Sequence, residues 1–375
     1  INDFNLELPS TLIQSENISA SFQKKEGKIE MPSLKFNGSI NAPRISLADI
    51  AGFVPKLSAT KEPISLKVNF NGSDDQIAVT RLELANEKHS LQLIANGGIK
   101  NYMEKMSWFA NVSELSANHE AIAYIVATAT GKDVPAVVTR IGDISLSGHA
   151  YGDKNRLTAN AKLATSLGNI KLALNKSSKN IKADIETKGF DVGKLADNKT
   201  LGHVSANLNI HGTSKDNLAA AGRVYDFDFN GYKYHDIQLN ASYRNKVVKG
   251  KIGIDDPNAD IDVNGLLNIA SKTPLLKVEA SVNNFAPHAL GLTPKWQSTA
   301  FAANINCDIK GNNINNANGM VEVSNFKMQS PENEYALNNV TVKTGFEGEN
   351  HYLNLESDFG TVNINGQFNY NTIAR

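Results

Sequence analysis

The sequence has little of several residue types that mark common protein classes. Of its 375 residues, one is cysteine and two are tryptophan, while aromatic residues make up 7% and charged residues 20%. Lys and Arg together number 38, as do Asp and Glu, so the formal net charge is zero. Proteins that bind nucleic-acid phosphates normally carry a basic excess, so we expect no nucleic-acid partner. The hydrophobic content of 41% with no net charge also excludes a disordered chain.

Two further absences concern disulfides and membrane spans. Cys307 has no second cysteine with which to pair, so cysteine usage leaves the redox compartment open. Its position in phase with Phe301 and Ile305 favours a buried, inert thiol over a nucleophile. The longest mostly apolar run, residues 121–129, is far shorter than the ~20 residues of a spanning helix, and no signal peptide is visible. We therefore expect a soluble segment cut from a longer protein.

In contrast, the sequence is rich in turn-forming residues, with 46 Asn and 27 Gly. Between them, apolar and polar residues alternate in segments such as 64–72 (ISLKVNFNG), 204–212 (VSANLNIHG) and 301–311 (FAANINCDIKG). This alternation predicts antiparallel strands with one apolar face. The residues expected to line that face as a hydrophobic groove are Ile64, Leu66, Val68, Phe70, Val204, Ala206, Leu208, Ile210, Phe301, Ala303, Ile305, Ile309, Val362 and Ile364.

Helical periodicity is confined to short inserts, and the main one is expected over residues 118–141. Asn118 is a suitable N-cap for a helix whose apolar residues recur at helical spacing as far as Gly131. A second short helix is expected to begin with Asp133 as its N-cap. Lesser helical turns are expected at three places: 47–53, 192–196 and 287–291.

Two stretches, 222–265 and 319–366, repeat the same order of features. Each begins with Gly and an alternating strand, passes an aromatic turn, and ends in an acidic turn followed by a second alternating strand and Gly. The intervals between such features are irregular, unlike the regular coils of a solenoid. We therefore expect residues 1–375 to form one continuous, elongated, β-rich piece of a larger protein, built as a long antiparallel meander.

Several segments together resemble a known family. They are the acidic turn and strand DDPNADIDVNG (255–265), its counterpart SDFGTVNING (357–366), the stretch VNNFAPHALGLT (282–293), and the short helical inserts that lead into Asn-rich strands ending in Gly. In these features the chain resembles the TamB and AsmA-like proteins of the Gram-negative cell envelope. The resemblance extends over most of the chain.

The resemblance implies a fold, a location and a function. The fold is a mainly β, elongated, curled antiparallel sheet, called a β-taco or half-pipe, with a hydrophobic groove and a few short helical inserts. The function is non-enzymatic: transport of phospholipid between the inner and outer membranes, assembly of outer-membrane proteins, or both. The protein would lie in the periplasm, held by an inner-membrane anchor outside this chain. Its implied partners are a phospholipid or other acyl-chain ligand and an outer-membrane assembly barrel protein.

The nearest approach to a metal motif lies in the acidic turn. Asp256, Asn258 and Asp260 match the first three ligand positions of a calcium loop. However, Ile261 stands where the loop needs Gly and Leu267 where it needs a bidentate Glu. This favours a polar turn that enters a strand, and we expect no metal site there.

Other catalytic and metal patterns are incomplete. His119 and Glu120 begin a zinc-protease pattern, but the second His is replaced by Ala123. His203 and His211 share one strand face without a third ligand nearby. The sequence contains no GxSxG, Walker or GxGxxG motif, so we expect neither an enzyme nor a cofactor. The adjacent carboxylates Asp74–Asp75 and Asp255–Asp256 are expected to be turn elements, because neighbours on a strand point to opposite faces.

Two alternatives remain open at this point. The apolar stripes would also suit the closed core of a β-sandwich or barrel, in which they pack against one another. A cell-surface adhesin or carbohydrate-binding β-protein would share the Asn-rich alternation. That function calls for clustered aromatic side chains on a polar face, whereas Trp108 and Trp296 are isolated in the sequence.

Overall fold

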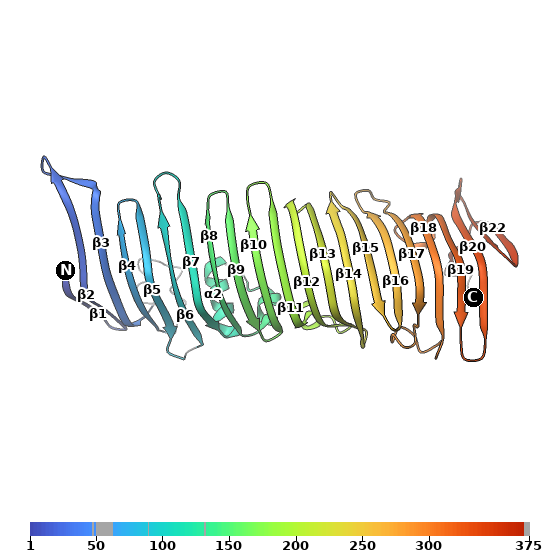
Figure 1. The fold of residues 1–375 in the computed structure, drawn as a ribbon, viewed down its shortest axis with the longest axis horizontal. Helices are drawn as coiled ribbons and strands as arrows, with labels where there is room; N and C mark the ends of the chain where they lie inside the picture. Colours follow the sequence, from blue (N-terminus) through green and yellow to red (C-terminus); the bar gives the residue numbers. More distant parts are fainter. Residues whose placement is uncertain (47–48, 50–62, 89, 131–132, 371–375) are drawn as a thin grey trace. The chain divides into compact units, whose positions relative to one another are not determined.

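The structure is a computed structural model that describes residues 1–46, 49, 63–88, 90–130 and 133–370. It is 70% strand and 7% helical. The 22 strands in these described residues run antiparallel, and the sheet is not closed (Figure 1). The predicted class, a mainly β chain with an antiparallel sheet and a few short helical inserts, is therefore confirmed.

The chain divides into two units, which we describe separately: Ile1–Ser178 with Lys194–Ala196, and Lys179–Gly193 with Asp197–Arg375. The strands of the first unit are β1 (Asn2–Leu8), β2 (Thr11–Lys25), β3 (Lys28–Ile45), β4 (Ile64–Ser73), β5 (Gln76–Asn86), β6 (Leu91–Lys100), β7 (Ser107–Ala117), β8 (Ile144–Asp153), β9 (Leu157–Thr165) and β10 (Gly168–Lys176).

The second unit is a meander of the same kind. Its strands are β11 (Ile181–Asp191), β12 (Leu201–Ser214), β13 (Asn217–Phe229), β14 (Tyr232–Arg244), β15 (Val247–Asp256), β16 (Ala259–Asn268), β17 (Leu275–Phe285), β18 (Ala300–Lys310), β19 (Asn318–Gln329), β20 (Glu334–Glu347), β21 (Asn350–Ser357) and β22 (Gly360–Gly366).

The strands form where the sequence alternates and stop where it turns. The three alternating segments that begin at Ile64, Val204 and Phe301 lie within β4, β12 and β18, as predicted. Between β13 and β14, Asn230 (φ 54°) and Gly231 (φ 84°) adopt the left-handed backbone of a two-residue hairpin turn. Asn-Gly is a favoured pair in such turns because both central residues need positive φ.

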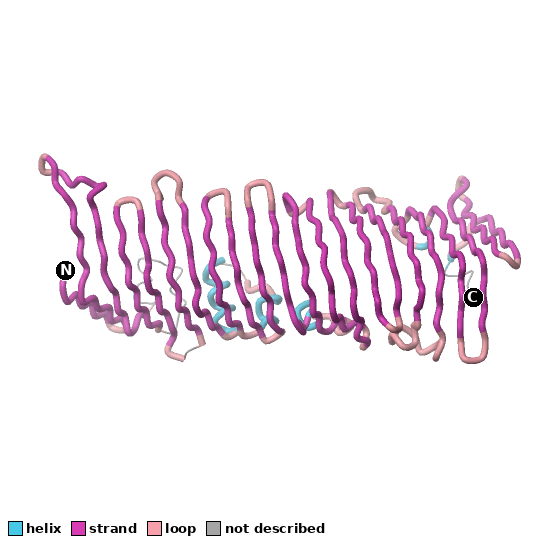
Figure 2. The backbone as a smooth tube through the Cα atoms, in the orientation of Figure 1, coloured by secondary structure: helices cyan, strands magenta, loops and turns pink. Residues whose placement is uncertain are grey.

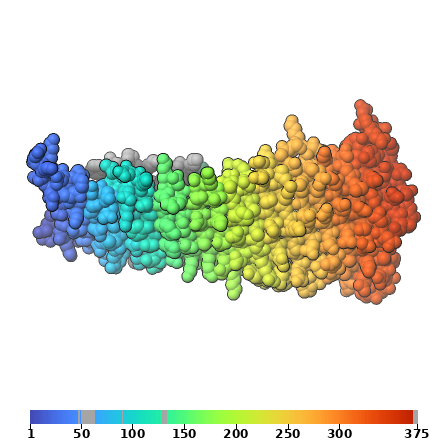
Figure 3. Space-filling view, turned by 45° about the horizontal axis from the view of Figure 1, so that its top comes forward, coloured from blue at the N-terminus to red at the C-terminus, as the bar shows by residue number. Residues whose placement is uncertain are grey.

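Within each unit, a strand pairs with its chain neighbours and with no other described strand. As a consequence, the bands of colour within each unit follow one another in sequence order in Figure 3. No second sheet packs face to face on the described strands. The alternative of a closed sandwich or barrel is therefore wrong, because the alternating strands build a single layer.

Helices α2 (His119–Thr130) and α3 (Ala136–Ile141) lie in the insert expected over 118–141. The Asn118 side chain accepts a hydrogen bond from the backbone N–H of Ala121 at 2.9 Å, as expected of an N-cap. The Asp133 cap is wrong: α3 begins after Pro135, which occupies the N-cap position without a side-chain cap. Proline suits the start of a helix because the N–H that it lacks would have no partner there.

The lesser helical turns have mixed outcomes. Helix α4 (Val192–Ala196) forms as expected. Residues 287–291 form hydrogen-bonded turns, in which the Leu290 N–H donates to the Ala286 carbonyl at 3.1 Å, and do not extend into a helix. The expected turn at 47–53 lies outside the described residues except for Asp49. A short 3-10 helix, η2 (Ile314–Asn316), closes with an Asn313–Asn316 capping box. Among the described residues, no helix has the length and apolar character needed to cross a bilayer.

The helical insert of the first unit lies at one edge of its sheet. The β7–β8 connection, which contains α2 and α3, runs from an odd to an even strand, and all such connections of a meander lie on the same edge. Figure 2 shows the α2 and α3 segment at that edge. The opposite edge carries the turns β2–β3, β4–β5, β6–β7 and β8–β9. The edge that holds α2 and α3 also carries the short β1–β2 and β9–β10 turns, so the helical insert is what distinguishes it from the opposite edge.

A buried carboxylate fixes the turn between β15 and β16. Asp256 is 3% exposed, and its Oδ1 accepts hydrogen bonds from the Tyr232 hydroxyl at 2.5 Å and the Asn258 backbone N–H at 2.8 Å. Its Oδ2 accepts one from the backbone N–H of His235 at 3.1 Å. Nearby, Leu290 of the β17–β18 connection is fully buried. Through these hydrogen bonds, Asp256 links β14 to the turn between β15 and β16.

Each of the two similar stretches spans parts of four consecutive strands, β13–β16 for 222–265 and β19–β22 for 319–366. Their first glycines are Gly222 (φ 157°) and Gly319 (φ 153°). A Cβ at Gly222 would lie 2.1 Å from the carbonyl oxygen of Asn207, and one at Gly319 would lie 2.0 Å from that of Asp308. Both positions need glycine because the preceding strand approaches too closely for any side chain.

Candidate functional site

The strand registers align the apolar residues of the first unit into rows across the sheet. One row, which we call the Leu66 ladder, continues through eight strands. Each member lies directly opposite the next on adjacent strands: Ala42, Leu66, Leu84, Leu93, Leu115, Leu146, Leu163 and Ile170. Directly opposed residues have Cβ atoms about 5 Å apart, so neighbouring side chains along such a row are in contact.

The second unit has the same feature on a larger scale. Its central row, the Ile252 ladder, runs from β11 to β20. Its members, each directly opposite the next, are Ile185, Leu208, Gly222, Leu239, Ile252, Val263, Ala280, Ile305, Val323 and Val340. Gly222 is the only member without a side chain. The row therefore forms a nearly continuous apolar stripe across ten strands.

A neighbouring row on the same face, the Cys307 ladder, crosses all twelve strands of the second unit. Its members are Ala183, Ile210, Ala220, Ala241, Gly250, Gly265, Val278, Cys307, Val321, Val342, Leu355 and Val362. Eleven intervals of ~4.8 Å between adjacent strands give this row a length of roughly 50 Å. The apolar face of this unit is thus as long as its meander.

The structure brings together several lining residues that are far apart in the sequence. Leu208 and Ile305 lie in the Ile252 ladder, and Ile210 and Val362 lie in the Cys307 ladder. A third row joins Ala206 to Ala303 through Val224, Ile237, Ile254, Ile261 and Val282. A fourth joins Ile309 to Ile364 through Gly319, Thr344 and Leu353.

The remaining lining residues also lie in the predicted strands. Ile64, Leu66, Val68 and Phe70 share one face of β4 in the first unit, and all four are half-buried. In the second unit, Val204 lies opposite Phe190 and Phe227, and Phe301 lies opposite Phe285 and Met328. Phe301 also contacts the ring of Trp296 edge to face.

The lining residues predicted from the sequence did not include most members of the ladders. It named residues of β4, β12, β18 and β22 only, whereas both long ladders of the second unit continue through β13–β17. The signal that would have found the omitted members is the same alternation, as in Ile252 and Ile254 of β15 or Ile261 and Val263 of β16. Sequence reasoning could place each residue on a face, but not opposite a particular partner.

The apolar face is partly shielded by its own side chains and is not covered by a second layer. Along β12, the apolar-face residues from Val204 to Ile210 are half-buried or buried while the intervening Asn207 and Asn209 are exposed. The shielding is incomplete: beside the paired glycines Gly250 and Gly265, Ile252 remains 40% exposed. A large apolar area of the described residues is therefore open to solvent or to a ligand.

Cys307 lies on this face between Val278 and Val321. Burial, with a smaller contribution from the negative charge of Asp308, raises the pKa of the Cys307 thiol. A raised pKa keeps the thiol protonated and unreactive at neutral pH. These surroundings agree with an inert, half-buried thiol.

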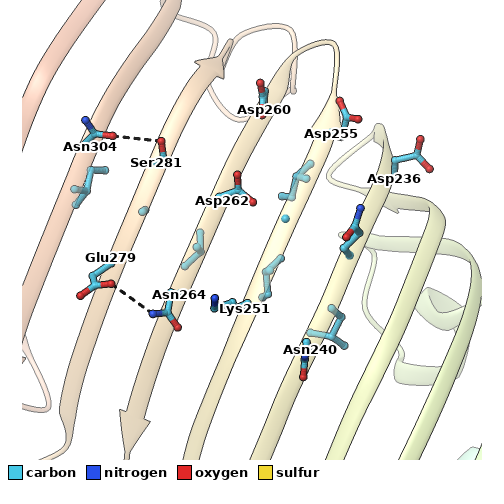
Figure 4. Close-up of a pocket in the computed structure, with 18 of the residues that line it drawn as sticks. Asp236, Asn240, Lys251, Asp255, Asp260, Asp262, Asn264, Glu279, Ser281 and Asn304 are labelled. Atoms are coloured by element: carbon cyan, nitrogen blue, oxygen red, sulfur yellow. Dashed lines mark hydrogen bonds between the residues drawn. The ribbon is translucent and has the colours of Figure 1, made fainter.

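The opposite face of the second unit is polar and contains a hollow of about 1240 Å³ over β13–β19. Figure 4 shows carboxylate, amide and hydroxyl side chains from neighbouring strands on this face. Asn264 donates a hydrogen bond to Glu279 at 3.5 Å, and Ser281 donates one to Asn304 at 3.3 Å. The hollow was not predicted, because curvature of a sheet leaves no trace in an alternating pattern.

The paired carboxylates of the sequence do not meet across this hollow. Asp255 is exposed on the polar face, whereas Asp256 is buried in the network with Tyr232. At the β4–β5 turn, Asp75 accepts a hydrogen bond from the Ser73 hydroxyl at 2.7 Å. Among the described residues, no group of three His, Cys, Asp or Glu side chains is arranged to hold a metal ion. The most extensive feature that the geometry offers for binding is thus the apolar face.

Comparison of the chain with models of known protein families, with curated proteins and with solved structures found no match.

Proposed function

We propose that the protein is a non-enzymatic carrier of acyl chains, which lie along the apolar face of its sheet. The observation that carries the proposal is the continuity of the ladders: the Ile252 ladder passes through ten strands without a polar side chain. In accordance with the resemblance to the TamB and AsmA-like proteins, the ligand is phospholipid in transit between the two membranes of a Gram-negative envelope, and the location is the periplasm.

The energetics of lipid movement supports this proposal. Exposing an acyl chain to water costs about 0.8 kcal/mol per CH₂, so a chain of ~15 methylenes faces a barrier on the order of 12 kcal/mol in an aqueous gap. A continuous apolar stripe lowers that barrier without any specific chemical group. The same stripe would accept an apolar segment of an outer-membrane protein, so assistance to barrel assembly remains part of the proposal.

The experiment is lipid extraction and native mass spectrometry of the purified protein. The wild type is expected to retain phospholipid, whereas Leu208→Asp and Ile305→Asp, which place a charge in the Ile252 ladder, are expected to lose it because a carboxylate disfavours hydrocarbon beside it. The matched controls are Asn207→Asp and Asn304→Asp, which place the same charge on the exposed polar face. A wild type free of lipid, or equal lipid in all four variants, would contradict the proposal.

A second candidate function has one observation in its favour. On the polar face of the first unit, the exposed side chains of Phe109 and Tyr151 lie directly opposite each other on β7 and β8. Beside them, Asn111 donates a hydrogen bond to Asn96 at 2.8 Å. Paired aromatic and amide side chains on a polar face suit a carbohydrate, as in an adhesin or carbohydrate-binding β-protein.

This candidate is tested by binding to a panel of immobilised glycans. Carbohydrate recognition predicts binding that Phe109→Ala and Tyr151→Ala both abolish while the lipid content stays unchanged. Absence of binding to every glycan on the panel would reject it.

A further inference from the structure

One edge of the second unit is basic where it carries the β14–β15, β16–β17 and β18–β19 connections. These connections all run from an even strand to the next odd one, so they lie on the same edge (Figure 1). Residues 244–247, 268–275 and 310–318 contain exposed cations and no Asp or Glu. We call this region the basic edge, and its cations are Arg244, Lys246, Lys272 and Lys310.

The connections of the basic edge are tied to one another by their backbones. The N–H of Ile269 in the β16–β17 connection donates a hydrogen bond to the carbonyl of Lys246 at 3.0 Å. The N–H of Gly311, after β18, donates one to the carbonyl of Pro274, also at 3.0 Å. The cations of successive connections are therefore held side by side along this edge.

Carboxylates do not neutralise the basic edge. Among the described residues, none of its four cations forms an ion pair. Two neighbouring cations are balanced: Lys277 pairs with Asp308 at 2.6 Å, and Lys215 of the β12–β13 turn is followed by Asp216. The next carboxylates along the edge are those of the β20–β21 turn, five strands or roughly 24 Å beyond β15.

The positive charge is gathered at one end of these strands. The stretch 237–254, which forms most of β14 and β15, contains four cations and no carboxylate. Its flanking residues, Asp236 and Asp255, lie toward the opposite edge, where the acidic β15–β16 turn is found. The two ends of the same strands therefore attract ligands of opposite charge.

Exposed apolar side chains reach the same edge on the apolar face. Val248, Leu267 and Leu276 lie directly opposite one another and are 37%, 38% and 39% exposed. Beyond them, Ile269 of the β16–β17 connection is 46% exposed. We call this the Val248 row, and its members are Tyr243, Val248, Leu267, Leu276 and Ile309.

The Val248 row continues the apolar ladders toward the basic edge. It lies two residues beyond the Cys307 ladder, which in turn lies two residues beyond the Ile252 ladder. Between Ile252 and Val248, the paired Gly250 and Gly265 present no side chains. Exposed apolar surface therefore extends over about 13 Å from Ile252 to the Val248 row.

Cations at the end of an exposed apolar surface suit one kind of ligand, an amphiphile with an anionic headgroup. A polyanion without acyl chains would contact the cations and leave the Val248 row open to water. A neutral amphiphile would cover the row and leave the cations unused. Lys and Arg near a membrane surface bind anionic headgroups, and hydrocarbon beside them removes apolar side chains from water.

We propose that the basic edge binds the anionic headgroup of a phospholipid whose acyl chains cover the Val248 row and the ladders beyond it. The inference rests on the proposed function and deepens it, because it names the class of phospholipid: anionic in preference to zwitterionic.

The test is a competition between two phospholipids with identical acyl chains. The full chain is incubated with an equimolar mixture of phosphatidylglycerol and phosphatidylcholine, and the bound lipid is identified by native mass spectrometry. The wild type should bind phosphatidylglycerol roughly fivefold over phosphatidylcholine, the effect of about one cation near an anionic headgroup. Replacing Arg244, Lys246 and Lys272 together by Gln should bring the ratio close to one.

The matched control removes the same charge from the opposite edge. Lys188, Lys233 and Lys327 are exposed and lie near that edge, on β11, β14 and β19. Replacing these three together by Gln should leave the ratio unchanged. An equal fall of the ratio in both triple variants would overturn the inference.

Two further arms separate this inference from the proposed function and from a simple anion site. Leu208→Asp should lower the total bound lipid without changing the ratio. Bound lipid with equal amounts of the two headgroups would overturn the inference and leave the proposed function intact, whereas a wild type without lipid would overturn both. Replacing chloride by inorganic phosphate at the same ionic strength should preserve the ratio; if phosphate abolished it, the basic edge would be a site for free phosphate.

Discussion

Replacement of the buried carboxylate Asp256 should open the acidic turn. In Asp256→Ala, the backbone N–H groups of His235 and Asn258 lose their acceptors, which lie at 3.1 and 2.8 Å in the native protein. A buried donor left without a partner costs about 1–3 kcal/mol, so two such donors together cost about 4 kcal/mol. The Tyr232 hydroxyl also loses its acceptor, although its oxygen still accepts a hydrogen bond from the Asn258 amide at 3.1 Å. Because Tyr232 is only half-buried, its hydroxyl can donate to water instead and adds less to this loss.

Asp256→Asn provides a graded comparison. Its remaining oxygen can still accept from Tyr232 and Asn258, but its amide nitrogen faces the His235 N–H and cannot accept a hydrogen bond. One orphaned donor corresponds to a loss of about 2 kcal/mol, half that of the alanine variant. The matched control is Asp255→Ala on the exposed face, where a change within about 0.5 kcal/mol is expected.

The appropriate assay is amide hydrogen exchange followed by mass spectrometry on peptides from β14, β15 and β16. In a single-layer sheet, opening is local, so the free energy of opening for these peptides measures the turn directly. Equal protection in Asp256→Ala and Asp255→Ala would refute the reasoning. If protection from exchange fell as much in Asp256→Asn as in Asp256→Ala, the loss would be due to the negative charge of the carboxylate and not to the number of hydrogen-bond acceptors.

The same network predicts an alkaline limit to stability. Burial, and next the hydrogen bond to Asp256, raises the pKa of Tyr232 above its ordinary value of 10.0. The stabilisation linked to this shift is present below pH 10 and is lost as the pH rises through the folded-state pKa. Protection of β14 should therefore fall above about pH 10 in the wild type. The fall should be smaller in Tyr232→Phe, and an identical fall in both would contradict the assignment.

Three further predictions concern a strand, a helix and the thiol. Gly222→Ala should destabilise β13 by more than about 2 kcal/mol, because the added Cβ would meet a backbone oxygen. The control Gly360→Ala has open space at its Cβ and should be nearly neutral. Equal amide exchange rates in the two variants would contradict this prediction. Asn118→Ala should destabilise α2 by about 1 kcal/mol, measured as faster exchange in α2, and unchanged exchange would show that the cap is dispensable. At neutral pH, native Cys307 should react with iodoacetamide far more slowly than the urea-unfolded chain, and equal rates would contradict its raised pKa.

The sequence predicts strand faces well because a side-chain period of two is a local property. Each lining residue named from the sequence lies in one of the strands β4, β12, β18 and β22. Register is not local, because a bulge such as that between Ser205 and Ala206 shifts the alignment of two whole strands. The sequence therefore could not show that Leu208 and Ile305 lie in the same ladder.

The start of α3 and the single-layer architecture could not be predicted from the sequence. Asp133 is a good capping residue by type, but Pro135 occupies the N-cap position and α3 begins directly after it. The single-layer architecture is also hidden from the sequence, since an uncovered apolar face and a sandwich core have the same alternation. Composition alone thus could not decide between a packed core and an open face.

Photocrosslinking tests the central claim most directly. A photoreactive phenylalanine analogue is placed at Leu208 or Ile305 in the Ile252 ladder, and at the adjacent Asn207 or Asn304 on the polar face. Because each pair differs by one residue, the two positions share a strand and differ only in face. The account predicts phospholipid adducts at Leu208 and Ile305 and none at Asn207 and Asn304. Adducts of equal yield on both faces, or none at any position, would contradict a lipid path along the apolar face.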